Sequence, residues 1–339
     1  MELRTEPTRF AFILRPEFPI SAMILASESL RIVNQNSGFD LFAWQFVSED
    51  GQDVRASNGM WLQSDCDFEA AAPADVVLLF EGNLPTQNIS RRLLGYLRSA
   101  ARFGGTVGGV DTGAYALAQA GLAATDGVPD VVLHWEAVPA FNENFPSANA
   151  QNCINQSNGN VVFSSGGIAS LDLMLDLIAR YSGEAMANEV ANAMVHSRRD
   201  ANTRQRRDHQ SEFETDNLAA AMVRKMEQNL DFPLTLAELA EALNTSRRTL
   251  ARISEDTFHI SPMRLYLRIR LQAARNYLFY EEHTIKDVAT ACGFSYPAAF
   301  SRAFRSQFSL TPSAFRKTLR NRQRLSVHPE IHRLITMHS

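Results

Sequence analysis

The residues whose types and spacing most clearly suggest chemistry lie in the stretch GTVGGVDTGAYALAQAG, residues 105–121. A short apolar strand runs into Gly109, Asp111 and Gly113, and an alanine-rich helix follows. Glycines on both sides of one polar residue, placed between a strand and a helix, are typical of a nucleophile elbow, which holds the central side chain in a strained turn above a sheet. In enzymes that position carries Ser or Cys, whereas this chain has Asp111.

Three roles are open for an aspartate at this position. Its carboxylate can hold a cation at the mouth of a pocket, such as an ammonium or guanidinium group. It can instead cap the following helix, which is worth about 1 kcal/mol. Nucleophilic catalysis is the least favoured role, because a carboxylate stabilised as an anion is a weaker nucleophile than a thiolate in the same place.

A second pattern, of apolar residues at helical spacing on both sides of Gly293, fills residues 284–317. This pattern predicts a helix-turn-helix, in which a glycine accepts the positive φ of the turn. Ser295 is placed to cap the second helix, and Pro297 falls in the first turn of that helix, where a missing N–H costs little. The outward face of the second helix then carries arginines that suit a DNA major groove.

The same pattern occurs earlier in the chain, around Asn244, which replaces the turn glycine because Asn enters the left-handed region more easily than most residues. Pro262 and Pro312 close the two units, and residues 263–279 between them read as one connecting helix. Two recognition helices joined by this rigid connecting helix would meet successive major-groove faces, which are about 34 Å apart. The outward residues, which are the candidates for DNA contact, are Arg247, Arg248 and Arg252 in the first unit and Tyr296, Ser301, Arg302 and Arg305 in the second.

This C-terminal part resembles a known domain. The run IKDVATACGFSYPAAFSRAFRSQFSLTPSAFR matches the signature of the AraC/XylS-type DNA-binding domain, and the resemblance covers residues 215–325. One departure is Ser309, where the family usually has glycine. The resemblance implies an all-α domain with two helix-turn-helix motifs that binds a double-stranded DNA operator and works with RNA polymerase.

The first two hundred residues alternate strand and helix signals, which predicts a parallel sheet covered by helices. Strands are expected at 10–14, 41–47, 76–80, 106–110, 131–135 and 161–164, and helices at 21–34, 89–101, 112–121, 168–181 and 183–195. Open sheets of this kind bind ligands at the carboxyl ends of their strands. The candidate ligand-binding residues are Asp111 and Thr112 in the elbow, Gly82 and Asn83 after the third strand, His134 and Trp135 after the fifth strand, and Glu28 on the first helix.

These candidates have competing structural roles. His134 is more often a satisfied structural histidine than a ligand contact. Trp135 either covers an ammonium group by cation–π attraction or packs in the core. Glu28 either lies beside the elbow or is an ordinary surface charge. Glu17 and Phe18, just after the first strand, are weaker candidates.

The N-terminal part also resembles a known domain. The stretches FAFILRPEFPI, ASESLRIVNQ, GGVDTGAYALAQAGL and LHWE are similar to the PfpI-like, class I glutamine-amidotransferase-like sensor domain of GlxA-type regulators, and the resemblance covers residues 8–197. It implies a flavodoxin-like α/β fold without catalytic activity. An Asp-Thr-Gly elbow resembles the subgroup that responds to amino acids and to betaine-like or carnitine-like nitrogen compounds.

Charge is distributed unevenly along the chain. Residues 1–214 hold 15 Lys and Arg against 26 Asp and Glu, a net of −11, whereas residues 215–325 hold 17 against 10, a net of +7. A basic module neutralises DNA phosphates, so the C-terminal part is expected to bind DNA with a strong salt dependence. The acidic N-terminal part has a different task.

Several further expectations follow from composition. Cys66, Cys153 and Cys292 are too scattered for a disulfide framework or a zinc site and are expected to be small buried residues. No apolar run approaches the roughly 18 residues that span a bilayer, so we expect a cytoplasmic protein without membrane contact, and neither a cofactor nor a metal. The polar, charged stretch between the two parts is expected to be a solvated linker.

The sequence therefore predicts a transcription regulator with a non-catalytic sensor domain at 1–197, a linker at 198–214, a DNA-binding domain at 215–325 and a tail at 326–339. We expect an activator that responds to a small-molecule inducer and forms a homodimer. Part of the apolar surface of residues 168–195 is either a dimer face or a core face. The alternative is an elbow-type hydrolase or amidotransferase tethered to DNA, which needs a nucleophile that neither Cys66 nor Cys153 supplies from an elbow.

Overall fold

The computed structural model describes residues 6–82, 85, 89–125, 128–205, 218–280 and 283–318. These residues form two compact units, the first ending at Gln205 and the second beginning at Leu218. Asn83, one of the candidate ligand residues, lies outside the described residues, as does the part of the expected linker after Gln205.

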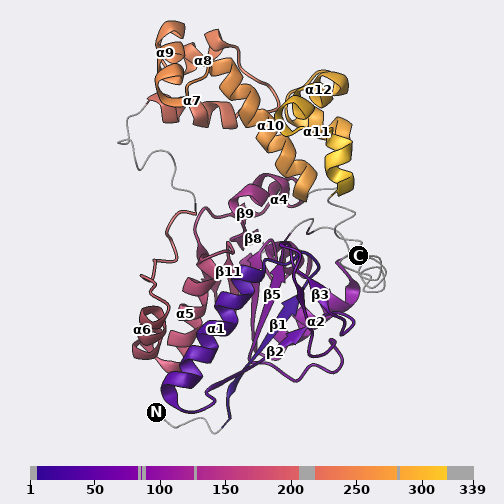
Figure 1. Ribbon diagram of the computed structural model, residues 1–339, viewed down its shortest axis with the longest axis vertical. Coiled ribbons are helices and arrows are strands. Elements are labelled where there is room, and N and C mark those ends of the chain that lie inside the picture. The colour runs from indigo at the N-terminus through magenta and orange to yellow at the C-terminus, as the bar shows by residue number, and fades with distance from the viewer. Residues whose placement is uncertain are drawn as a thin grey trace, which may run out of the picture. The chain divides into compact units, whose positions relative to one another are not determined.

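The first unit is built on a six-stranded sheet with the strand order β10-β11-β6-β5-β1-β2 (Figure 1). Five strands are parallel: β1 (Thr8–Leu14), β2 (Phe42–Val47), β5 (Val76–Glu81), β6 (Thr106–Asp111) and β11 (Val161–Ser164). The strand β10 (Asn155–Asn158) joins antiparallel at the edge. Numbered in chain order, the parallel strands lie in the order 2-1-3-4-5, which is flavodoxin-like and confirms the predicted fold class.

Helices cover both faces of this sheet because alternate residues of each strand point to opposite sides. Phe10 and Phe12 of β1 belong to one core cluster with the helices α1 (Ile20–Ser37), α5 (Ala169–Ser182) and α6 (Glu184–Ala193). The other face is packed by α2 (Arg91–Arg102) and α3 (Ala114–Gln119), which contact β6. The sheet is thus buried on both sides, and polar chemistry is left to its edges.

One predicted strand, 131–135, is wrong. The strand β8 (Val128–Val131) ends at Val131, where it pairs with β9 (Asn149–Ala150) in a small separate sheet that also contains β7 (Ala124–Thr125). A short 3₁₀ helix, η1 (Trp135–Ala137), then begins because the Nδ1 atom of His134 accepts a hydrogen bond from the Glu136 amide at 3.4 Å. The helix α4 (Val138–Asn144) follows, and a two-stranded hairpin of β3 (Val54–Arg55) and β4 (Trp61–Leu62) completes the unit.

The second unit is helical and contains both predicted helix-turn-helix motifs. The helix α7 (Leu218–Glu227) precedes the first motif, α8 (Leu236–Ala242) with α9 (Arg247–Phe258); the long α10 (Pro262–Tyr280) leads to the second, α11 (Ile285–Ala291) with α12 (Pro297–Phe308). Thr235 and Thr284 cap the first helix of each motif through capping boxes. Asn244 and Gly293 adopt positive φ values of 48° and 70° in the two turns, as the sequence predicts.

Ser295 does not cap α12, contrary to expectation. The helix begins one residue later, with Tyr296 at the N-cap position and Pro297 at N1, and no side chain caps it. Ser246 does cap α9, since its hydroxyl oxygen accepts a hydrogen bond from the Thr249 amide at 3.1 Å. The second motif has one extra residue after its turn, which moves Ser295 out of the capping position.

The two recognition helices end alike. His259 and Ser309 close α9 and α12 in the left-handed conformation, with φ of 55° and 62°. Ser309 therefore takes the backbone conformation that a glycine would favour, at a cost that a non-glycine residue bears in this region. None of the described helices is both long enough and apolar enough to cross a membrane.

Candidate ligand site and DNA-binding face

Asp111 stands at the end of β6 in a strained elbow with a φ of 63°. The flanking glycines are required by close packing: a Cβ atom on Gly113 would lie 2.8 Å from the carbonyl oxygen of Leu79, and one on Gly109 would lie 2.8 Å from the backbone of Gly113. Asp111 does not cap α3, whose N-cap residue is Gly113 without a side-chain cap. The strained backbone therefore positions this carboxyl group for something other than helix capping.

The neighbourhood of Asp111 is acidic. Glu81, the last residue of β5, is the register partner of Asp111 across the sheet, and Glu136 of η1 also acts on it. Burial raises the pKa of Asp111 to about 8, and the negative charges of Glu136 and Glu81 add to the effect. Burial likewise raises the pKa of Glu81 to about 7, although the neighbouring Arg15 opposes the shift. Among the described residues, the charged side chains that act on Asp111 are therefore acidic.

The arginines near this edge are already paired with other carboxylates. Arg15 Nε donates to Glu81 Oε1 at 3.1 Å, and an Arg15 terminal nitrogen lies 3.7 Å from Glu49. Arg55 is 3.2 Å from Glu17, which is 1% exposed. Glu81 Oε2 is buried without a hydrogen-bond partner. Within the described chain, no donor bonds the carboxylate of Asp111.

Stability of the first unit should depend on pH because of these two carboxyl groups. Their folded-state pKa values, about 8 for Asp111 and about 7 for Glu81, exceed the roughly 3.9 and 4.3 expected in the unfolded chain. Below about pH 4 both states are protonated; between pH 4 and 8 the folded state binds more protons, so stability is expected to fall as pH rises. Thermal midpoints from pH 5 to 9 should decline less in Asp111→Asn than in the wild type, and a parallel decline in both would contradict this assignment.

The structure brings some of the predicted ligand residues to this edge and not others. Thr112 is fully buried, and its hydroxyl donates to the Gly82 carbonyl at 2.5 Å, so this residue ties the elbow to the end of β5. Gly82 packs so closely that an added Cβ would lie 2.3 Å from the carbonyl oxygen of Glu17. Glu28 forms an ion pair with Arg31 on the same helix and is not among the charges that act on Asp111.

His134 and Trp135 lie next to the elbow. The His134 amide donates to the Asp111 carbonyl at 3.2 Å, and burial lowers the pKa of the His134 ring, which agrees with a neutral imidazole that accepts from the Glu136 amide. The rings of His134 and Trp135 are 5.8 Å apart. The Trp135 amide donates to Gln205 Oε1 at 2.9 Å.

The sequence interpretation missed Glu81, Glu136 and Gln205. A charged residue at the end of the apolar run VVLLFE was a usable signal for Glu81, since it marks the carboxyl end of a strand that runs beside the elbow strand. Gln205 carried no such signal, because its partners are 52 to 72 residues away in the chain.

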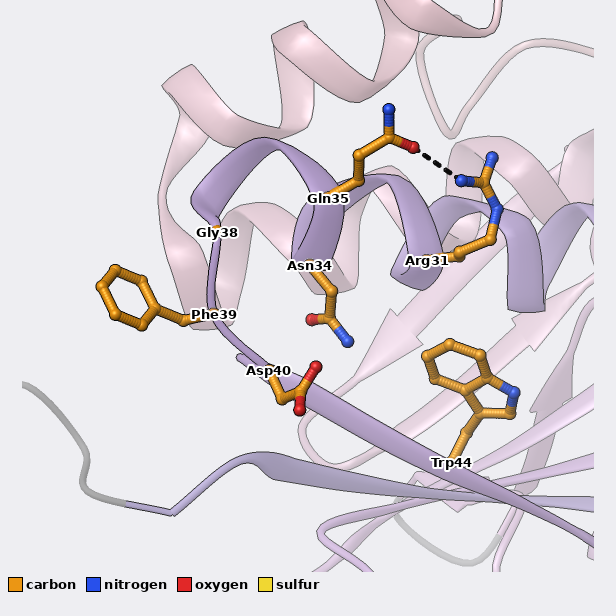
Figure 2. A pocket seen from close by; sticks show the side chains of 7 residues that line it. All are labelled: Arg31, Asn34, Gln35, Gly38, Phe39, Asp40 and Trp44. Carbon is orange, nitrogen blue, oxygen red and sulfur yellow. Dashed lines mark hydrogen bonds between the residues drawn. The ribbon is translucent and has the colours of Figure 1, made fainter.

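A hollow lies at the opposite, amino edge of the sheet, where α1 ends and β2 begins (Figure 2). The Asn34 side chain there bonds both the carbonyl and the amide of Phe42, at 2.7 and 3.0 Å, and Arg31 donates to Gln35 at 2.7 Å. These polar groups already satisfy one another, so we place the candidate site at the carboxyl edge. The hollow is lined by Arg31, Asn34, Gln35, Gly38, Phe39, Asp40 and Trp44.

The predicted DNA-contacting residues lie on the two recognition helices. Arg247, Arg248 and Arg252 of α9 are exposed, as are Tyr296, Arg302 and Arg305 at or on α12, and Ser301 is partly exposed. The opposite faces of these two helices are buried, through Leu250 in α9 and through Phe300 and Phe304 in α12. A solvated row of cationic side chains on a buried support is the arrangement that phosphate and base contacts need.

Arg270 of α10 fixes the turn of the second motif. Its Nε and a terminal nitrogen donate to the carbonyls of Cys292 and Gly293, both at 2.7 Å, and its guanidinium lies 4.4 Å from the ring centre of Phe294. Burial lowers the pKa of this arginine. Arg270 thus braces the fold, whereas the exposed arginines remain available to a partner.

Comparisons with known proteins agree with both units. A family model described as "Helix-turn-helix domain" matches residues 239–318. The chain is 37% identical over 316 residues to the HTH-type transcriptional regulator CdhR of Pseudomonas aeruginosa, covering 91% of this chain and 92% of that protein. It is 31% identical to the HTH-type transcriptional regulator GlxA of Rhizobium meliloti, covering 91% and 95%.

A solved structure shows the same fold as the first unit. The chain resembles a ThiJ/PfpI family protein from Pseudomonas syringae with a TM-score of 0.50 and 14% identity, covering 70% of this chain and 90% of that one. At this identity the likeness concerns the fold alone.

Proposed function

Because the chain belongs to the AraC family of transcriptional regulators, in its GlxA-type group, we propose that its α/β unit senses a small nitrogen-containing metabolite through the cationic group of that metabolite, and that its helical unit binds a DNA operator. The inducer belongs to the amino acid, betaine or carnitine class. The observation that carries the proposal is Asp111, a carboxyl group presented by a strained elbow beside Glu81 and Glu136, to which no donor bonds among the described residues.

A bound cation would supply the countercharge that this site lacks. The carboxylate of Asp111 would pair with the ligand's cationic group. A primary ammonium or guanidinium group would also donate a charge-assisted hydrogen bond, worth about 1.5–3 kcal/mol, whereas a quaternary ammonium group has no N–H and would pair by charge alone. Trp135 would cover the ligand's ammonium group by cation–π attraction. Ligand binding would then hold Asp111 in its charged form, which the free protein disfavours, so affinity should rise with pH up to about 8.

The experiment that tests this function is a thermal-shift panel on the full chain. Glycine betaine, L-carnitine, L-arginine and putrescine are added separately at pH 8. A ligand at 100 times its dissociation constant raises the free energy of unfolding by about 2.7 kcal/mol. A shift from at least one cation, with none from glucose or succinate as uncharged and anionic controls, supports the proposal. Shifts confined to the controls contradict it.

On DNA, we propose that the exposed arginines of α9 and α12 read an operator. Replacing Arg302 with alanine should cost about 1–3 kcal/mol on an operator selected from random duplexes and relax specificity at one base pair, if Arg302 reads a base. The matched control is Arg264→Ala, which removes the same charge from exposed α10 outside both recognition helices. Fluorescence anisotropy with selected and random duplexes compares the DNA affinities of the two variants. Equal losses of affinity on both DNAs for Arg302→Ala would mean that Arg302 contacts a phosphate and not a base.

We further propose that the protein is an activator that works as a homodimer with RNA polymerase in the cytoplasm, as its resemblance to GlxA-type regulators implies. The competing function is a hydrolase tethered to DNA, which needs a nucleophile in the elbow. Cys66 lies beside β2 and Cys153 lies in the loop before β10, so neither occupies the elbow. Turnover of an amide or ester that disappears in Asp111→Asn would revive that function.

A further inference from the structure

The chain that leaves the α/β unit is fastened to it by side chains over residues 196–205, which we call the exit strap. Asp172 of α5, 1% exposed, anchors the beginning of this strap. Its carboxylate accepts hydrogen bonds from the Arg199 amide at 2.9 Å, from Arg199 Nε at 2.9 Å and from an Arg199 terminal nitrogen at 2.6 Å, and His196 Nε2 lies 2.8 Å away. The strap therefore starts from a fixed point.

The end of the strap is held beside the sheet. The amides of Ile154 and Asn155 donate to the carbonyls of Thr203 and Ala201, at 2.9 and 3.2 Å, so the strap lies next to the beginning of the edge strand β10. These hydrogen bonds replace bonds to solvent and so hold the backbone of the strap in place. The first described part of the predicted linker is thus part of the sensor unit.

The side chain of Gln205 fixes the end of the strap through three hydrogen bonds, which we call the clasp. Its side-chain oxygen accepts from the Trp135 amide at 2.9 Å, and its side-chain nitrogen donates to the carbonyls of Leu133 and Cys153, both at 2.8 Å. One amide group thereby joins two loops that are separate in the chain. Gln205 is also the last described residue before the segment that leads to α7.

The clasp contacts Trp135, one of the candidate ligand residues, and lies one residue from the hydrogen bond between His134 and Asp111. His134 lies between Leu133 and Trp135, the two residues that Gln205 holds, and the His134 amide donates to the Asp111 carbonyl at 3.2 Å. The path from the elbow to the exit strap therefore consists of two hydrogen bonds and one stretch of backbone. Any ligand that moves Asp111 or the 133–135 backbone changes the geometry in which Gln205 bonds.

We propose that Gln205 couples the ligand site to the chain segment that carries the DNA-binding unit. This inference rests on the proposed sensor function and names its regulatory element: an exit strap with a clasped and an unclasped arrangement, which ligand binding at Asp111 interconverts. Coupling between two sites requires a two-state element that both sites bias. The strap contacts the ligand-site loop through Gln205, and the chain after Gln205 leads to the DNA-binding unit, so we assign that element to the strap.

The first test uses the full chain, a duplex selected from random sequence by that chain, and the cation that gives the largest thermal shift among glycine betaine, L-carnitine, L-arginine and putrescine. In the wild type this cation should change DNA affinity by about 5- to 150-fold. In Gln205→Ala the change should fall to less than about twofold, while the thermal shift persists. The matched control is Asn202→Ala, an exposed strap residue whose side chain takes no part in the clasp, and it should respond as the wild type does. A full DNA response in Gln205→Ala would overturn the proposal.

The second test needs no ligand and separates failure of the coupling from failure of the sensor function. Asp111→Asn removes the carboxyl group that would bind a cation, and the readout is hydrogen exchange of the Arg199 amide at the far end of the strap. We expect Asp111→Asn to change this exchange rate at least about fivefold in the wild-type background and to leave it unchanged in the Gln205→Ala background. Equal effects in both backgrounds, or none in either, would overturn the coupling even where a cation stabilises the protein. If no cation gives a thermal shift, the sensor function fails and this test alone decides the coupling.

Discussion

Asp111→Asn should lose most of the stabilisation that a cationic ligand gives to the wild-type protein. In the wild type, a ligand at 100 times its dissociation constant adds about 2.7 kcal/mol to the free energy of unfolding. For a ligand with an N–H donor, such as L-arginine or putrescine, loss of a charge-assisted hydrogen bond worth about 2.7 kcal/mol weakens binding about 100-fold. The same ligand concentration then equals the new dissociation constant and adds only about 0.4 kcal/mol. Calorimetric thermal midpoints with and without ligand measure the difference.

The comparison needs each variant's own ligand-free midpoint. Asn at position 111 removes the charge that burial and the neighbouring Glu136 and Glu81 make unfavourable, so the free Asp111→Asn protein should be more stable than the wild type at pH 8. The matched control is Glu28→Gln, which removes a carboxylate of the same unit that pairs with Arg31 on the surface of α1. An undiminished ligand shift in Asp111→Asn, or a lost shift in Glu28→Gln, would move the site away from the elbow.

The elements that carry these side chains could be read from the sequence because local patterns specify them. The apolar strands, the amphipathic helices and the two turns at Asn244 and Gly293 depend on residues close in the chain. The elbow is of this kind too, since its strand, its glycines and its helix are consecutive. The predicted strand at 131–135 failed because its backbone groups bond elsewhere. Gln205 bonds the Leu133 carbonyl and the Trp135 amide, the His134 amide bonds Asp111, and the Glu136 amide bonds the His134 side chain where the 3₁₀ helix begins.

The electrostatics of the site could not be read in the same way, because they depend on register. Glu81 affects Asp111 only because β5 and β6 pair with these two residues opposite each other. Arg15 bonds Glu81, which is 66 residues away in the chain, so its guanidinium is already engaged by a neighbouring side chain. The position of Gln205 likewise follows from partners at distances of 52 to 72 residues. A linear pattern of charges predicts an acidic module but not which acids share a site.

Gly293→Ala should unfold the second helix-turn-helix motif or abolish its DNA binding. Gly293 has a φ of 70°, and a Cβ atom there would lie 2.5 Å from the carbonyl oxygen of Leu230 and 2.5 Å from the ring of Pro233. The left-handed conformation costs a non-glycine residue about 1–2 kcal/mol, and overpacking typically adds 1–3 kcal/mol. Relaxation of this turn is made harder by Arg270, whose guanidinium bonds the carbonyls of Cys292 and Gly293 and so holds the turn in place.

The first motif supplies the control, since Asn244 occupies the corresponding turn with a φ of 48° and already carries a Cβ atom. Asn244→Ala meets no new contact at that atom and should cost only about 1 kcal/mol, the preference of Asn over Ala for the left-handed region. Chemical denaturation of the full chain and anisotropy with the selected duplex compare the two variants. Equal losses would mean that the second turn relaxes around a side chain. A loss of several kcal/mol confined to Gly293→Ala would show that the close approach of the segment from Leu230 to Pro233, and not the turn conformation alone, requires glycine in the second motif.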